Sequence, residues 1–129
     1  MQHQQYAGQV HLKSLQSIFH LQENLKRQSK RLAKLVGVPL SKAQYLLAVH
    51  VYSESSFADI KNKIDKGDMS GRLHLAAVAP DASQHVLDVF ARDFGDLYVS
   101  LQESPISELY SGTMRDFISG LFDLKSENI

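Results

Sequence analysis

The chain has 129 residues, 43% of them hydrophobic, with 14 basic and 14 acidic side chains, which suits one domain with a substantial core. A charged fraction of 22% and a mean hydropathy of -0.22 exclude a disordered tail protein, and the absence of cysteine excludes disulfide scaffolds and thiolate metal sites. No apolar run approaches the roughly 18 residues of a membrane span and no signal-peptide pattern opens the chain, so we expect a cytoplasmic protein without a membrane partner.

A long helix is predicted over about residues 10–36, after a polar, uncapped and frayed start at residues 1–8. Gly37 is a plausible C-terminal stop, and Pro39 cannot easily continue a helix. The apolar residues that recur at helical spacing are Leu12, Leu15, Phe19, Leu25, Leu32, Leu35 and Val36.

Two shorter helices are predicted next, over about residues 41–52 and 57–66. Ser41 is interpreted as an N-cap that forms a capping box with Gln44. Ser56 and Asp59 form a weaker capping pair for the second of these helices, and Gly67 ends it.

The stretch from residue 67 to 101 has two interpretations. Residues 73–78 fit a short strand or a helical turn, after which Asp81 or Ser83 caps a helix. That helix would carry an apolar seam across Gly95; its residues are Leu87, Phe90, Phe94, Leu97 and Leu101. The alternative breaks the helix at Gly95 and makes residues 97–101 a strand, which would give a small two-strand element near 72–78 and 97–101. We favour the helix because the helical period fits more positions.

The last helical stretch is predicted to start at Pro105, a favourable first helical residue, and to reach about residue 122. Ser111 and Gly112 mark a possible break within it. The expected fold is therefore mainly α, a bundle of about five helices in one compact domain.

The neutral total hides two halves of opposite charge. Residues 1–66 carry ten basic and four acidic side chains, a formal charge of +6, whereas residues 67–129 carry four basic and ten acidic ones, a charge of -6. Such asymmetry favours electrostatic partnering. It is equally compatible with halves that neutralise each other inside one fold or between copies.

The strongest local feature is a set of five cations, which we call the basic stripe: Lys26, Arg27, Lys30, Arg31 and Lys34. At about 100° per residue they span an arc of about 140°, opposite Leu25 and Leu32. The stripe could neutralise nucleic-acid phosphates, dock an acidic protein surface, or be an ordinary solvated helix face. No aromatic residues alternate with it, which argues against a platform for stacking single-stranded bases.

The two helices at 41–52 and 57–66 could form a helix-turn-helix, with three lysines on the second one: Lys61, Lys63 and Lys66. The turn between them lacks the usual glycine, and apart from Asn62 few residues there suit base readout. An ordinary helical hairpin is the favoured interpretation.

No catalytic, cofactor or metal site is predicted. The six histidines show no metal-ligand spacing, and the sequence contains no nucleophile elbow, phosphate loop or paired-carboxylate signature. We therefore do not expect an enzyme. The apolar seam is long enough to serve as a homodimer interface, although plain core is the favoured interpretation.

Residues 25–64 resemble a small helical module found at the start of glyoxalase-related proteins and in uncharacterised plasmid and phage proteins. The basic first helix of that module is matched by Lys26, Arg27, Lys30, Arg31 and Leu32. The middle helix is matched by Val38, Pro39, Leu40, Ser41, Ala43, Gln44, Leu46, Leu47 and Ala48. The closing turn is matched by Ser56, Phe57, Ala58, Asp59 and Ile60.

This sequence departs from the family pattern where Ser53 and Glu54 replace Gly-Tyr and where Phe57 replaces a tryptophan. The resemblance covers roughly a third of the chain. It implies a helical fold and a mobile-element or phage context, but not glyoxalase chemistry, because the metal-binding domain belongs elsewhere in those proteins.

The resulting hypothesis is a non-catalytic binding or regulatory protein that docks on or occludes an unidentified partner protein through its charge-polarised surface. The alternative is a helix-turn-helix-like DNA-binding regulator that uses residues 26–34 and the three lysines at 61, 63 and 66.

Overall fold

The computed structural model describes the backbone of residues 2–125 and the side chains of residues 17–125. The elements in chain order are α1 (Gln2–Val36), α2 (Leu40–Leu46), the π-helical η1 (Leu47–Val51), α3 (Phe57–Asp65), the 3-10 helix η2 (Leu73–Ala77), α4 (Gln84–Gln102), α5 (Ile106–Leu109) and α6 (Met114–Phe122). No strand occurs between residues 2 and 125, which confirms the predicted mainly α class.

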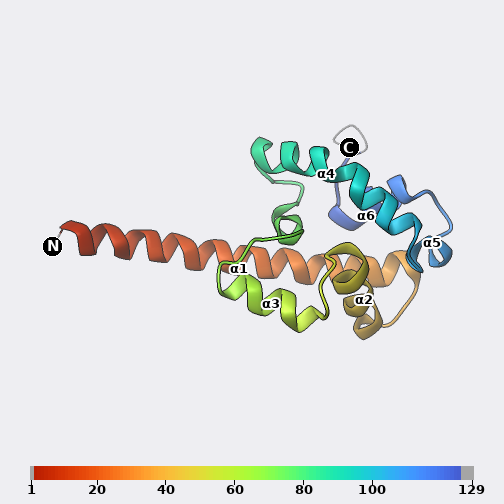
Figure 1. Cartoon of the computed structure of the whole chain (residues 1–129), viewed down its shortest axis with the longest axis horizontal. Helices are drawn as coiled ribbons and strands as arrows, with labels where there is room; N and C mark the ends of the chain where they lie inside the picture. Colours follow the sequence, from red (N-terminus) through yellow and green to blue (C-terminus); the bar gives the residue numbers. More distant parts are fainter. Residues whose placement is uncertain (1, 126–129) are drawn as a thin grey trace.

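Helix α1 is longer than the sequence predicted. It begins at Gln2 rather than near residue 10, so the expected frayed segment is helical, and its N-terminal part extends beyond the other helices (Figure 1). The predicted C-terminal stop is confirmed. Gly37 adopts a left-handed φ of 69°, and the Val38 N–H donates to the Ala33 carbonyl oxygen at 3.1 Å, the closure typical of a Schellman motif.

Helices α2 and η1 form one continuous helical segment whose start differs from the prediction. Pro39 occupies the N-cap position and Leu40 is the first helical residue, so Ser41 is not the cap and the predicted capping box is wrong. The reason is that Pro39 combines a φ of -61° with an extended ψ of 156°, the non-helical conformation of an N-cap residue, so that the helix starts directly after it. The segment ends at Val51, with Tyr52 as its C-cap, and the next residue, Ser53, adopts a left-handed φ of 55°.

Hydroxyl caps begin three of the later helices. At the start of α3 the Ser56 Oγ accepts the Asp59 N–H at 3.1 Å, as predicted. At the start of α4 the Ser83 Oγ accepts the Val86 N–H at 3.3 Å, so Ser83 is the cap of the two residues that the sequence offered. The Thr113 Oγ1 accepts the Asp116 N–H at 3.1 Å at the start of α6. The predicted break at residues 111–112 is confirmed, since α5 ends before it and α6 begins after it.

The two-strand alternative is wrong. Residues 73–77 form the 3-10 helix η2, and residues 97–101 lie inside α4, which continues through Gly95. Leu73, Leu75 and Ala76 are all buried. A half-buried strand would turn alternate side chains outward, so this burial pattern fits a short helical turn instead.

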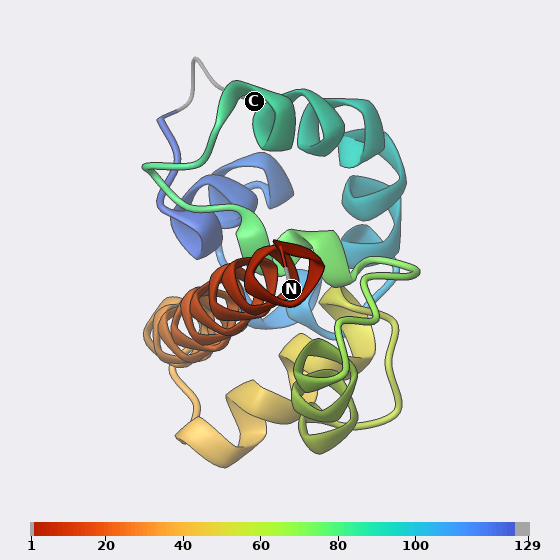
Figure 2. The same cartoon turned by 90° about the vertical axis from the view of Figure 1, so that its left-hand side faces the viewer.

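The C-terminal half of α1 lies at the centre of the molecule. Helices α2 and α3 pack on one side of it, while α4 and α6 lie on the other (Figures 1 and 2). One hydrophobic cluster includes buried side chains from both the basic and the acidic half of the chain, such as Leu32, Ile60, Phe90 and Phe117. The two halves therefore share a single core.

Buried polar side chains tie α1 to η2 and η1. The Asn24 amide donates to the Ala76 carbonyl oxygen at 2.9 Å, and the Gln28 amide donates to the Leu75 carbonyl oxygen at 3.0 Å. The Tyr52 hydroxyl donates to the Gln28 Oε1 at 2.6 Å. Burial raises the pKa of Tyr52 above its usual value, with the hydrogen bond to Gln28 acting in the opposite direction. These bonds hold α1 in a fixed orientation, and its outward face carries the basic stripe.

Candidate functional site

Four members of the basic stripe are exposed along one face of α1: Lys26, Arg27, Lys30 and Lys34. The buried Gln28 and Leu32 lie on the opposite face, against η2 and the core. The predicted separation of a packed face from a cationic face is therefore observed.

Arg31, the fifth member of the stripe, is directed toward α6. Its Nη1 donates to the Leu121 carbonyl oxygen at 3.2 Å, and its Nη2 lies 3.9 Å from the Asp123 Oδ2. The Arg31 side chain is only 27% exposed. A cation at the C-terminal end of a helix satisfies carbonyl groups that lack an intrahelical partner, so Arg31 has a structural role here.

The other four cations are largely free of internal partners. Among the described residues, Lys26, Lys30 and Lys34 have no hydrogen bond or ion pair, and Arg27 contacts only Asn24 of its own helix, at 3.4 Å. Asp123 is the one described acidic residue of the C-terminal half that pairs with the stripe. Within residues 17–125, Arg31 is thus the one member of the basic stripe that pairs with the acidic half, and the other four members are exposed to solvent.

The three lysines predicted on α3 separate into different environments. The Lys63 Nζ donates to the Glu54 Oε1 at 2.7 Å, and this hydrogen bond raises the pKa of Lys63. Lys66 caps the C-terminus of α3 and is exposed. Lys61 is also exposed, on the part of α3 next to α1, where its carbonyl oxygen accepts the Gln22 amide at 3.0 Å. Lys61 therefore lies near the basic stripe, whereas Lys63 is already paired.

A groove runs between α1, α2 and α3, and we call it the α1–α3 groove. Its volume is about 340 Å³. Apolar lining comes from Leu25, Leu40 and Phe57, one residue from each helix. Charged lining comes from Lys26, Lys30, Lys61 and Glu23. No local sequence signal indicates this groove, because its residues come from three separate helices.

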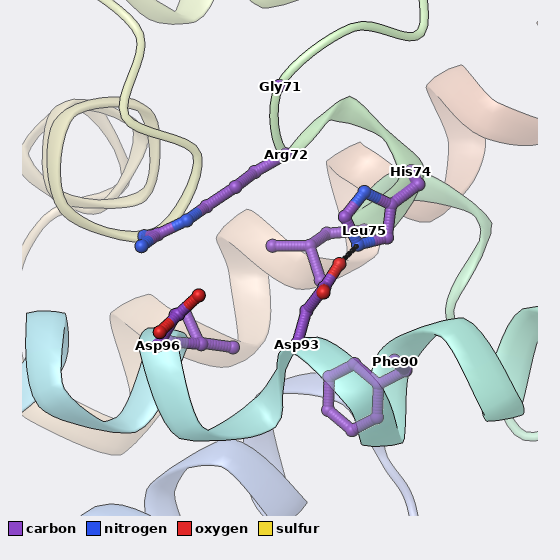
Figure 3. A pocket seen from close by; sticks show the side chains of 8 residues that line it. Gly71, Arg72, His74, Leu75, Phe90, Asp93 and Asp96 are labelled. Atoms are coloured by element: carbon purple, nitrogen blue, oxygen red, sulfur yellow. Dashed lines mark ion pairs between the residues drawn. The ribbon is translucent and has the colours of Figure 1, made fainter.

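A second, smaller cavity of about 190 Å³ lies between η2 and α4 (Figure 3). The His74 Nε2 lies 3.2 Å from the Asp93 Oδ2. Arg72 extends past Asp96 and donates to the Ser100 Oγ at 2.8 Å and to the Val51 carbonyl oxygen at 3.3 Å. These contacts link η2 to α4 and to η1, so the polar groups in this cavity hold elements together.

The described residues contain no group of three or more His, Asp or Glu side chains placed to hold a metal ion. Within the same residues no single helix is long and apolar enough to cross a membrane, and the one bent pair that passes by length and composition, Ser17–Val36 with Leu40–Val51, turns by 106°.

The apolar seam of α4 lies inside the single chain. Phe90, Leu97 and Leu101 are at most 2% exposed, and Leu87 and Phe94 pack partly buried against the same core. The Phe90 ring contacts the Phe122 ring of α6 edge to face, with centroids 5.2 Å apart. The seam is therefore used for intramolecular packing, the core interpretation that the sequence favoured.

Scans of protein-family models and searches of curated proteins and solved structures find no match to this chain. Its function is therefore inferred from the geometry of its own residues.

Proposed function

We propose that this protein is a non-catalytic binding protein that docks on a partner protein through the exposed cations of the basic stripe. One observation carries the proposal: Lys26, Lys30 and Lys34 lie on one helix face with no acidic partner among the described residues. A cluster of unpaired like charges steers and selects an oppositely charged partner.

The surroundings of the stripe favour a protein over a nucleic acid as the partner. Lys26 and Lys30 also line the α1–α3 groove, where Leu40 is 43% exposed. Protein interfaces combine an apolar centre with a polar rim, whereas the phosphate backbone of DNA gains nothing from exposed leucine.

DNA binding is the second candidate, and the same four cations on one continuous helix support it. The helix-turn-helix version has less support. Lys63 already donates a hydrogen bond to Glu54. The exposed residues of α3 and its C-cap include the acidic Asp65 as well as the cations Lys61 and Lys66.

We also propose a mobile-element or phage context, on the strength of the family resemblance over residues 25–64, and a cytoplasmic location, which the absence of cysteine favours. Ser53 stands where that family has glycine, and its left-handed φ of 55° is a conformation that glycine adopts freely. The backbone at this turn is thus compatible with the family pattern despite the substitution.

The test compares the full chain with a Lys26→Glu/Lys30→Glu variant in two measurements. Fluorescence anisotropy with a random-sequence DNA duplex at about 0.15 M salt is expected to show no saturable binding by either protein, since steep weakening with salt is typical of phosphate-driven contacts. Affinity purification from the native host after nuclease treatment is expected to retain a specific protein that the variant loses.

A matched variant, Lys42→Glu/Lys66→Glu, changes the same number of exposed charges outside the stripe and should still retain that protein. Tight, salt-sensitive duplex binding that the stripe variant abolishes would instead favour the DNA-binding candidate. Retention of the same proteins by all three chains would contradict a role for the stripe in partner selection.

A further inference from the structure

We infer that the α1–α3 groove receives an acidic amphipathic helix of the partner protein, with one bulky apolar side chain seated between Leu40 and Phe57. This inference rests on the proposed function and adds the chemistry of the bound segment. It depends on the coincidence of two features on one surface, an apolar floor and a set of unpaired cations at its rim.

The apolar floor lacks a cover within the described residues. Leu25, at 1% exposure, forms its base, Phe57 is half-buried, and Leu40 is 43% exposed. Covering an exposed leucine at the edge of a concave surface with an apolar group is favourable, because it removes apolar surface from water. A groove of about 340 Å³ is at the small end of the range for ligand pockets, which suits one or two anchoring side chains.

The rim selects a negatively charged occupant. Lys26, Lys30 and Lys61 line the groove and have no hydrogen bond or ion pair from their ammonium groups among the described residues. Glu23 is the single carboxylate in the lining, so the charged lining is positive by two. Charge complementarity therefore favours a segment rich in Asp and Glu.

The spacing of the cations favours a helical segment. Lys26 and Lys30 are one turn apart on α1, a rise of about 6 Å, which equals the separation of acidic residues four apart on a bound helix. Recognition of an amphipathic helix in a groove between helices uses apolar anchors on one face with charges along its edges. The three helices that form the α1–α3 groove provide both sets of contacts.

A second copy of this chain is a poor occupant. Its longest acidic helix within the described residues is α4. The apolar seam of α4 is buried against α6 and the core, and the hydrophobic residue that α4 does expose, Val99 at 54%, is smaller than the bulky anchor inferred here. Withdrawing Phe90 or Leu97 to serve as an anchor would open that core and destabilise the chain. A separate acidic partner requires no such rearrangement.

The inference can be tested by peptide display. The intact chain is immobilised at about 0.15 M salt, and a library of random peptides of about 16 residues, long enough for four helical turns, is selected against it. The selected peptides are expected to contain a bulky apolar residue flanked by Asp or Glu at helical spacing. Anisotropy measurements with a labelled selected peptide should give a dissociation constant that rises with salt.

Two pairs of variants locate the binding site of that peptide. The Lys26→Glu/Lys30→Glu change should weaken binding about tenfold or more, because it places like charges opposite the acidic peptide. The Arg27→Glu/Lys34→Glu change alters stripe residues that do not line the groove and should have a much smaller effect. Leu40→Ser should weaken binding about tenfold, whereas Leu109→Ser, at a residue that is also 43% exposed, should change it less than about twofold.

Selection of no peptide, or of peptides without acidic residues, would overturn the inference. Equal effects of Leu40→Ser and Leu109→Ser would also overturn it, since the apolar floor would then play no part. If binding of the peptide depends on Arg27 and Lys34 but not on Leu40, the proposed function is retained and only the inference about the groove is rejected. If unlabelled duplex DNA displaces the peptide, the groove binds nucleic acid instead. If sedimentation shows that the chain dimerises and that Leu40→Ser abolishes the dimer, the groove binds a second copy of the chain.

Discussion

The buried hydrogen bond between Tyr52 and Gln28 allows a quantitative test of how α1 is held in the fold. The Tyr52 hydroxyl and the Gln28 Oε1 are 2.6 Å apart, and the two residues are 1% and 0% exposed. Neither atom can turn to water when its partner is removed. The expected cost of breaking this bond is therefore dominated by the group left without a partner.

Each single substitution should destabilise the protein. Tyr52→Phe leaves the Gln28 Oε1 without its donor and should lower the free energy of unfolding by about 1–3 kcal/mol. Gln28→Met leaves the Tyr52 hydroxyl without its acceptor and should cost a similar amount. It also removes the bond to the Leu75 carbonyl oxygen, but that oxygen still accepts the Val78 N–H at 3.1 Å, so it is not left without a partner.

The double variant should be much less destabilised than the sum of the two singles. With both polar groups gone, no unpaired atom remains in the core, so the coupling free energy should be about 1–3 kcal/mol. Urea denaturation followed by far-ultraviolet circular dichroism at neutral pH gives each free energy of unfolding. Tyr45→Phe is the matched control, because Tyr45 is 53% exposed and its change should stay within about 0.5 kcal/mol.

Additive losses in the double variant would refute this reasoning. A Tyr52→Phe variant as stable as the Tyr45→Phe control would refute it as well, since the hydrogen bond would then have no net effect on stability.

Two further predictions follow from the turn after η1. Because the pKa of Tyr52 is raised in the folded chain, its hydroxyl loses the proton at lower pH in the unfolded chain than in the folded one. The free energy of unfolding should therefore be unaffected below a pH of about 10 and should fall by up to about 1.4 kcal/mol per pH unit above it. Urea denaturation at a series of pH values should show that Tyr52→Phe reduces this fall. The opposite result, an unchanged slope in the variant, would assign the alkaline loss to other groups. Ser53→Gly should raise the free energy of unfolding by about 0.5–1 kcal/mol, because the left-handed conformation of residue 53 is strained for a residue with a side chain but not for glycine. Ser53→Ala should not raise it. A glycine variant less stable than the original chain would show that the conformation of Ser53 is not strained.

Local signals in the sequence were sufficient for most helix boundaries. Gly37 ends α1 and Ser56 caps α3, as predicted, and Ser83, one of two candidates, caps α4. Such signals work because a cap or a left-handed turn involves groups within five residues of each other along the chain. The same local rules failed at the start of α2, where Pro39 and Ser41 both suit a helix start and the proline takes the cap position.

Which side of α1 would be cationic could also be read from the sequence alone, since the helical period determines which residues share a face. Lys26, Lys30 and Lys34 are exposed as that period requires. The 3-10 conformation of residues 73–77 was not accessible in this way. It is held by Asn24 and Gln28, about 50 residues away in the chain, whose side-chain amides donate hydrogen bonds to the Ala76 and Leu75 carbonyl oxygens.

Only the tertiary structure decided which charges remain available. Arg31 belongs to the basic stripe by its spacing, but its guanidinium donates a hydrogen bond to the Leu121 carbonyl oxygen, 90 residues away in the chain. The α1–α3 groove likewise needs Leu25, Leu40 and Phe57 from three helices to converge. Periodicity and caps describe neighbours along the chain, whereas a groove and an occupied cation depend on how distant helices pack, and that information enters only when the core forms.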